Sequence, residues 1–260
     1  MRIAVGIKQV PAASEGATDM ERGFVIRTGR KRLNPYDGTA VEAALRLRDL
    51  FGGQVDVYTM GPESAAEVVT EALSMGADNG WLMTDKAFAG ADSLVTARTL
   101  AEGFNHGGPY DLYIFGQKTT DGDTGQVGPS VASFLRAPFV GRVIAFDQAD
   151  EHGLTLQQVV DNMHQVVQVV FPAVISVARE SFVPRIPSLK MKMRKKTVNE
   201  LKLTDLQNQD PLSFGSKGSP TKIKCVYYPE RPVKAHMVTV NPGEAADIIL
   251  KAVETLHEPQ

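Results

Sequence analysis

Residues 111–135 read DLYIFGQKTTDGDTGQVGPSVASFL, and this stretch decides the fold. An apolar strand pattern (111–116) leads into a glycine-rich turn and then into a helix pattern (125–135). A continuous apolar strand is typical of a parallel sheet that helices cover on both faces. The stretch therefore predicts one strand–loop–helix unit of an α/β fold.

The same alternation precedes this unit. Strand patterns and helix patterns follow one another along the chain at 2–10, 37–51, 54–60, 61–75, 80–83 and 92–104. Asp92 is the expected N-cap of the last of these helices. Strands that alternate with helices of this length predict right-handed crossovers and a mostly parallel, doubly wound, Rossmann-like sheet.

Two further groups of β-rich segments modify this plan. Residues 24–27 and 31–33 flank Thr28-Gly29-Arg30 and predict a hairpin excursion. After Pro138, four β-rich segments joined by short turns predict antiparallel additions to the sheet edge; they are 139–146, 154–160, 165–170 and 173–178.

The C-terminal part differs in character. Residues 184–196 are basic and bounded by proline, 197–232 read as mostly irregular, and 242–256 form an amphipathic helix pattern. A long irregular stretch is unusual inside a compact domain. We therefore expect an α/β domain over 1–196 and an arm over 197–260 that contacts a partner subunit. Composition alone fits a mobile tail equally well, because the terminal helix needs a cover for its apolar face.

Composition excludes several classes of function. The chain has 260 residues, 43% of them hydrophobic, and a net charge of −2, which gives no reason to expect a nucleic-acid partner. Cys225 is the only cysteine and the five histidines are scattered, so no metal site is expected. The sequence has no apolar run of membrane-spanning length and no signal-peptide pattern. We expect a cytoplasmic protein, or one in an organelle lumen reached by a presequence already absent.

The candidate chemistry lies where the predicted strands end. In parallel sheets, ligands bind at these carboxyl ends, and the free N–H groups that begin a helix suit a phosphate. The stretch 116–129 places glycines, hydroxyls and an amide there. Asp121 and Asp123 would repel a phosphate, which favours capping or ribose contacts for them, and such turns also occur without a ligand. No Walker sequence, G-x-G-x-x-G fingerprint or catalytic triad is present, so no catalytic residue is expected and the chemistry would belong to a bound cofactor.

Ordered motifs indicate a family. The sequence over about 1–225 resembles electron-transfer flavoprotein beta subunits, and the match rests on Lys8-Gln9-Val10-Pro11, Asn34-Pro35-Tyr36-Asp37, Thr59-Met60-Gly61-Pro62, Met75-Gly76-Ala77-Asp78, Ala89-Gly90-Ala91-Asp92, Asp121–Pro129, Phe171-Pro172-Ala173-Val174, Pro187-Ser188-Leu189 and Gly218-Ser219-Pro220-Thr221. Residues 157–165 depart from the glycine-containing hairpin that is usual in relatives, and Gly125 stands where relatives often carry alanine.

The resemblance implies a heterodimer with an alpha subunit that holds an FAD. The beta subunit would bind either AMP, as in simple carriers, or a second FAD, as in electron-bifurcating members. The Asp-Gly-Asp-Thr loop resembles the FAD-binding form, which implies NAD as a transient hydride donor, acyl-CoA dehydrogenase as a partner, and ferredoxin or flavodoxin as a low-potential acceptor. The alternative is a simple carrier with structural AMP that passes electrons from acyl-CoA dehydrogenases to the respiratory chain. Membership of this family implies an electron carrier. The protein would take part in NADH oxidation only if it bifurcates electrons.

The resemblance also implies the residues of the site. Thr124 and Gln126 would supply donors, and Lys8 would stabilise charge on a reduced flavin or, alternatively, be an ordinary surface lysine. The implied cofactor-binding residues are Val5, Gly6, Lys8, Asn34, Asp37, Met60, Gly61, Gly90, Ala91, Asp92, Gly116, Asp121, Asp123, Thr124, Gly125, Gln126, Val127 and Gly128.

Residues 184–196 resemble the loop by which this family docks acyl-CoA dehydrogenases. Leu189 would be the apolar anchor, and the lysines and arginine that follow it would steer an acidic partner. Without the family, an ordinary solvated lysine run would explain the same residues.

Two other classes remain to be weighed. A stand-alone adenine-nucleotide enzyme would need a phosphate-gripping loop after the first strand, which Lys8-Gln9-Val10 is not. A nucleotide-sensing stress protein would be much shorter and would lack both the basic loop and the arm.

Overall fold

The computed structural model describes residues 1–12, 17–19, 24–26, 30–179, 181–222, 224 and 239–257. The chain divides into two compact units, Met1–Lys224 and Cys225–Gln260. The division falls later than the predicted boundary at residue 196. Whether the arm over 197–260 contacts a partner subunit stays a prediction.

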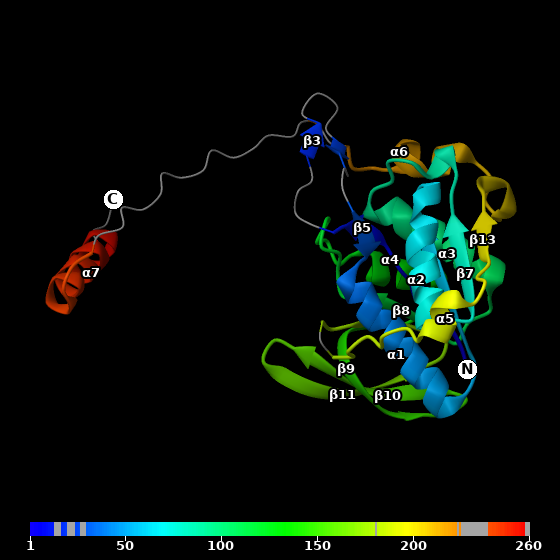
Figure 1. The fold of residues 1–260 in the computed structure, drawn as a ribbon, viewed down its shortest axis with the longest axis horizontal. Coiled ribbons are helices and arrows are strands. Elements are labelled where there is room, and N and C mark those ends of the chain that lie inside the picture. Colours follow the sequence, from blue (N-terminus) through cyan, green and yellow to red (C-terminus); the bar gives the residue numbers. More distant parts are fainter. Residues whose placement is uncertain are drawn as a thin grey trace. The chain divides into compact units, whose positions relative to one another are not determined.

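A nine-stranded sheet forms the first unit (Figure 1), and its strand order is β11-β10-β9-β12-β8-β1-β6-β7-β13. The strands of this sheet are β1 (Arg2–Gly6), β6 (Gln54–Met60), β7 (Asn79–Met83), β8 (Leu112–Gly116), β9 (Phe139–Ala149), β10 (Gly153–Val160), β11 (Met163–Val170), β12 (Ala173–Val177) and β13 (Val198–Leu201). The seven strands β9-β12-β8-β1-β6-β7-β13 each run parallel to their neighbours in this row. The predicted mostly parallel α/β sheet is confirmed.

Helices cover both faces of the sheet. They are α1 (Pro35–Phe51), α2 (Ala66–Met75), α3 (Ser93–Gly107) and α4 (Val127–Leu135), with α5 (Leu189–Met193) and α6 (Gly215–Gly218) as short additions. Short 3₁₀ turns occur at η1 (Glu63–Ala65), η2 (Lys86–Phe88), η3 (Leu203–Asp205) and η4 (Pro211–Ser213). The second unit contains α7 (Pro242–His257), as predicted. No helix in the described part of the chain is long and apolar enough to cross a membrane.

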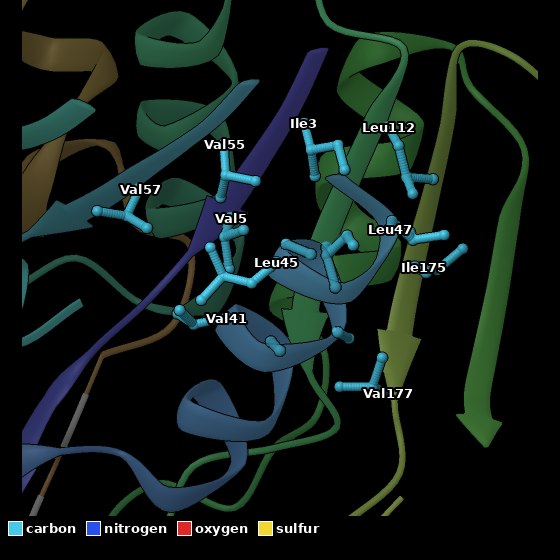
Figure 2. Close-up of a cluster of buried hydrophobic side chains, with 14 of the residues drawn as sticks. Ile3, Val5, Val41, Leu45, Leu47, Val55, Val57, Leu112, Ile175 and Val177 are labelled. Carbon is cyan, nitrogen blue, oxygen red and sulfur yellow. The ribbon is translucent and has the colours of Figure 1, made fainter. Parts of the chain in front are cut away.

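Two hydrophobic clusters hold these layers together. Helices α1 and α2 pack on one face, where Val41 and Leu45 of α1 meet Val5 and Val57 of the strands (Figure 2). Helices α3 and α4 pack on the other face through a cluster centred on Phe104. Full burial of one such side chain contributes about 1.5–3 kcal/mol. The apolar side chains of α1 recur every three to four residues, and Gly52 ends the helix with a φ of 72°.

Three predictions about strands need correction. Residues 173–178 do not join the edge in antiparallel fashion, because β12 lies inside the sheet and pairs parallel with both β8 and β9. The expected hairpin around Thr28-Gly29 is also wrong, and its turn lies partly outside the described residues. Strand β5 (Lys31–Leu33) pairs with β2 (Gln9–Pro11), and β4 (Phe24–Ile26) pairs with β3 (Ala17–Asp19).

The third correction concerns the segment that follows residue 197. Strand β13 extends the main sheet by pairing parallel with β7, and the turns η3, η4 and α6 follow where irregular chain was expected. At the opposite edge, β9, β10 and β11 form the predicted antiparallel pairs.

Candidate functional site

The strand order reverses direction at one point of the sheet. From β1 the chain proceeds outward to β6 and β7, whereas β8 lies on the other side of β1. Loops that leave β1 and β8 then run to opposite faces, and such a switch point opens a crevice at the carboxyl ends of its strands. We call the loops around this point the switch-point loops; they comprise Ile7–Lys8, Asn34–Asp37 and Gln117–Gln126.

Lys8 follows the end of β1 and joins two of these loops. Its main-chain N–H donates to Asp37 Oδ2 over 2.8 Å. Its Nζ donates to Asp121 Oδ1, also over 2.8 Å. One residue thus connects the first turn of α1 to the loop after β8.

The side chain of Asn34 also connects the start of α1 to the loop after β8. It is the N-cap residue of α1, but its side chain makes no capping hydrogen bond. Instead, Nδ2 donates to the carbonyl of Lys118 over 2.9 Å and Oδ1 accepts from the N–H of Thr120 over 3.3 Å. Because Asn34 is fully buried, both contacts lie under the loop and fix where it begins.

Asp37 is a buried carboxyl group in the first turn of α1. Burial raises its pKa to about 7, although hydrogen bonds from Asn34 and from the main chain of Lys8 and Gly116 act in the opposite direction. The approach of β8 is close here. A Cβ on Gly116 would lie 2.5 Å from Asp37 Oδ1 and 2.6 Å from the carbonyl carbon of Tyr36. Only glycine allows this contact.

The loop Gln117–Gln126 turns back on itself. The N–H of Asp123 donates to the carbonyl of Thr119 over 3.0 Å, and the carboxylate of Asp123 pairs with Lys118 Nζ at 2.8 Å. Gly125 has a φ of +63°, a conformation that favours glycine. The loop ends exposed, with Thr124 and Gln126 beside the first turn of α4, whose N–H groups have no partner within the helix.

A second loop, Ala89–Ser93, adjoins it. Asp92 caps α3 as predicted, because Oδ1 accepts from the N–H of Val95 over 3.0 Å, while Oδ2 accepts from the N–H of Thr221 over 3.1 Å. Burial opposes these hydrogen bonds, but they hold the pKa of Asp92 below its usual value. Ser93 Oγ donates to Thr124 Oγ1 over 3.5 Å and so links this loop to the one after β8.

The remaining expected residues differ in position. Val5 is fully buried and its side chain lies in the core cluster on the α1 face. Gly6 lies under the ring of Phe115, which a Cβ would overlap. Met60 packs against the other core cluster, and the N–H of Gly61 donates to the carbonyl of Met83 over 3.1 Å. Gly128 is buried and Val127 and Ala91 are partly buried, whereas Gly90 is exposed.

Sequence reasoning missed the polar residues that hold the Ala89–Ser93 loop in place. Ser219 Oγ accepts from the N–H of Asp92 over 2.9 Å, and the N–H of Ser216 donates to the carbonyl of Ala89 over 2.9 Å. The glycine- and hydroxyl-rich run 215–221 carried the signal. It was assigned to the arm, because nothing local indicates that it folds back onto α3.

Sequence reasoning also missed a cationic group over Tyr36. Lys118 Nζ lies 5.9 Å and Arg179 Cζ 5.6 Å from the centre of this ring. A cavity of about 430 Å³ on the α1 face is lined by Arg179 and reaches the switch-point loops through Asn34. Arg179 and Lys118 thus place two cationic groups beside Tyr36, in the first turn of α1.

The fold is a mostly parallel α/β sheet, and polar and charged side chains meet in the loops at its switch point. Residues 23–206 match the electron transfer flavoprotein domain family. The chain is 36% identical to an electron transfer flavoprotein subunit beta of Thermoanaerobacterium thermosaccharolyticum over 99% of each chain. It is 34% identical to the caffeyl-CoA reductase-Etf complex subunit CarD of Acetobacterium woodii over 99% of each chain. It is 33% identical to the protein FixA of Bradyrhizobium diazoefficiens over 100% of this chain and 93% of that one.

The protein belongs to the electron transfer flavoprotein beta subunit family. This membership gives it an electron-transfer role.

Proposed function

We propose that this chain binds FAD at the switch-point loops and acts with a larger alpha subunit as an electron-bifurcating flavoprotein. One observation carries the proposal. The loop after β8 brings the exposed Thr124 and Gln126 to the N-terminus of α4, and its Asp121 pairs with Lys8, which follows the neighbouring strand β1. This combination of helix N–H groups, hydroxyl, amide and ammonium suits a nucleotide phosphate.

The charges of the loop fit this ligand better than its sequence suggests. Two aspartates stand in the loop, but Asp121 pairs with Lys8 and Asp123 pairs with Lys118. The four charges sum to zero, so the two aspartates do not give the loop a net negative charge.

Each residue has a role in this proposal. The N–H groups of Val127 and Gly128 face the phosphates, Thr124 and Gln126 orient the ribityl or ribose portion, and Asn34 and Asp37 form the floor. FAD, when bound, supplies one-electron and two-electron transfer. Lys8, beside the crevice, stabilises negative charge on the reduced cofactor. The residues of the chain bind and orient, and none of them needs to act as a nucleophile or base.

Two considerations favour FAD and bifurcation over AMP. The loop has the Asp-Gly-Asp-Thr form at 121–124, and the relative CarD is by its name a subunit of a caffeyl-CoA reductase-Etf complex. In this function NADH donates a hydride, one electron goes to an acyl-CoA dehydrogenase and the other to ferredoxin or flavodoxin. A simple carrier with structural AMP is the alternative.

Leu189 is the proposed contact with the dehydrogenase. It begins α5, its side chain is 73% exposed, and Lys190, Lys192, Arg194 and Lys195 follow it. An exposed apolar side chain within a basic surround fits an apolar pocket on an acidic surface.

The second unit supplies the proposed contact with the alpha subunit. Ile248, Ile249 and Val253 are exposed on α7. They form an apolar stripe at a spacing that a partner helix or groove would cover.

A count of cofactors tests the proposal. The chain is co-expressed with its alpha subunit, and nucleotides are extracted from the purified complex and quantified. Two FAD per heterodimer are expected. One FAD with one AMP would support the simple carrier, and one FAD with no further nucleotide would refute nucleotide binding by this subunit.

A further inference from the structure

Arg185 fastens the segment before α5 to helix α1. Its main-chain N–H and its Nε both donate to Glu42 Oε2, over 3.1 and 2.7 Å. Its Nη1 donates to Asp49 Oδ2 over 2.9 Å. Glu42 and Asp49 are seven residues apart, about two helical turns, so they lie on one side of α1. A single guanidinium therefore holds two points of the helix.

The contact between Arg185 and Glu42 is the more buried of the two. The side chain of Glu42 is 4% exposed, and its Oε1 accepts from Arg46 Nε over 2.9 Å. Burial alone would raise the pKa of Glu42, but the hydrogen bonds from Arg185 and Arg46 hold it below the usual value. A buried carboxylate that keeps its charge resists separation from its partner, because loss of the partner leaves an unpaired buried charge.

The docking segment, residues 184–196, exposes apolar side chains beyond the point where Arg185 fastens it to α1. Ile186 is 89% exposed and Leu189 is 73% exposed. Ser188 Oγ accepts from the N–H of Met191 over 3.2 Å and caps α5. After α5, Lys196 Nζ donates to the carbonyls of Met191, Lys192 and Arg194 over 2.7, 3.1 and 3.0 Å. Of the basic run, Lys196 thus serves the segment itself.

We propose that Arg185 is a positioning residue that holds Ile186 and Leu189 in the orientation in which an acidic partner protein receives them. The inference rests on the docking role proposed above. An apolar anchor that is ordered before binding loses less conformational entropy in the complex, so its affinity rises without any new contact. The alternative is that Arg185 only neutralises the buried charge of Glu42. That purely structural role predicts no change in docking when Arg185 is replaced.

The chain offers a matched control. Arg46 also donates to Glu42 from the exposed side, but it belongs to α1 and makes no hydrogen bond to the docking segment. Arg185→Gln and Arg46→Gln each remove one cation from the same carboxylate. Only the first removes the guanidinium bonds between α1 and the docking segment, although the main-chain N–H of residue 185 can still donate to Glu42. Arg185→Lys keeps the charge, but one ammonium cannot bridge both carboxylates in the bidentate manner of arginine.

Two measurements on the full heterodimer test the inference. We expect Arg185→Gln to speed amide hydrogen exchange at Met191, Lys192 and Arg194 by about tenfold, and Arg46→Gln to leave it within about twofold. We also expect Arg185→Gln to raise the KM for the dehydrogenase by about tenfold with kcat and flavin content unchanged, and Arg185→Lys to fall between. If Arg185→Gln impairs folding, Glu42→Gln/Arg185→Gln replaces it, since this variant leaves no unpaired buried charge.

The outcomes separate the inference from the docking proposal. Unchanged hydrogen exchange in Arg185→Gln overturns the positioning role. Faster exchange with an unchanged KM also overturns it, provided that Leu189→Ala raises the KM. If Leu189→Ala leaves the KM unchanged, the docking surface itself is refuted, and the inference falls with it.

Discussion

The switch-point loops and the docking segment 184–196 both connect elements of the first unit, but they are built in opposite ways. At the switch point, charged side chains pair with one another, as Lys8 does with Asp121 and Lys118 with Asp123. In the docking segment, the exposed side chains include the apolar Ile186 and Leu189.

The difference follows from what each surface must receive. A crevice for a charged cofactor needs donors that are held ready and balanced, so that the ligand exchanges partners within a preformed frame. A surface for a transient protein partner needs apolar area and long-range attraction, so it leaves apolar groups and lysines in solvent. In both regions the frame consists of buried residues of α1 and its N-cap, which are Asn34 and Asp37 in the first and Glu42 in the second.

The largest expected effect concerns Asp37 and pH. Its folded-state pKa of about 7 lies above the ordinary 3.8, so between these values the folded chain binds more protons than the unfolded chain. Stability therefore falls as pH rises from about 4 to about 7, by an amount on the order of 4 kcal/mol. Asp37→Asn should flatten this dependence in urea titrations at several pH values. An unchanged pH profile in the variant would show that this carboxyl is not the source.

The next effect concerns the close approach of β8 to α1. Gly116→Ala forces a methyl group against Asp37 and Tyr36, and we expect a loss of about 1–3 kcal/mol in unfolding free energy. Gly122→Ala is the control in the same loop, because its Cβ would meet no atom closer than 3.5 Å. We expect this control to stay within about 0.5 kcal/mol of the parent. Equal stability of the two variants in thermal denaturation would contradict the described packing.

The docking segment predicts an effect on kinetics instead of stability. Leu189→Ala removes the apolar anchor and should slow electron transfer to the dehydrogenase by about 30-fold at low partner concentration, which corresponds to about 2 kcal/mol. Leu212→Ala is the matched control, since Leu212 is a leucine with 64% exposure on η4. Stopped-flow kinetics would measure both, and flavin content should be equal in the two variants. Indistinguishable rates would remove the docking role.

The smallest expected effect concerns Lys8. Lys8→Met removes the ammonium group that is proposed to stabilise the reduced cofactor, so the reduction potential should fall. A tenfold loss of preference for the reduced form corresponds to about 30 mV for a two-electron couple. Anaerobic redox titration would measure the shift, with the exposed Lys86→Met as control. An unaltered potential together with unaltered flavin content would exclude the role.

Much of the fold follows from local pattern, and the residues show why some of it does not. The helices α1 to α4 and their strands were predicted because apolar spacing and caps such as Asp92 are local signals. The place of β12 was not predictable, because its apolar run is the same for parallel and antiparallel neighbours. The position of β13 at the far edge depends on a contact with β7 more than a hundred residues away in sequence.

Some features of the candidate site could likewise be predicted from the sequence, and others could not. The loop 121–128 was evident from its glycines and hydroxyls. The hydrogen bonds from Asn34 to Lys118 and Thr120 were not, since they join positions far apart in the chain. Nor does any local pattern disclose that burial raises the pKa of Asp37.

One measurement tests the central claim most directly. In the purified heterodimer, Thr124→Val/Gln126→Leu removes the exposed donors of the switch-point loop without touching the core, and extracted nucleotides are counted against the parent complex. The account predicts that the parent holds two nucleotides per heterodimer and that the variant loses one of them while both subunits stay associated. Equal nucleotide content in parent and variant would contradict it.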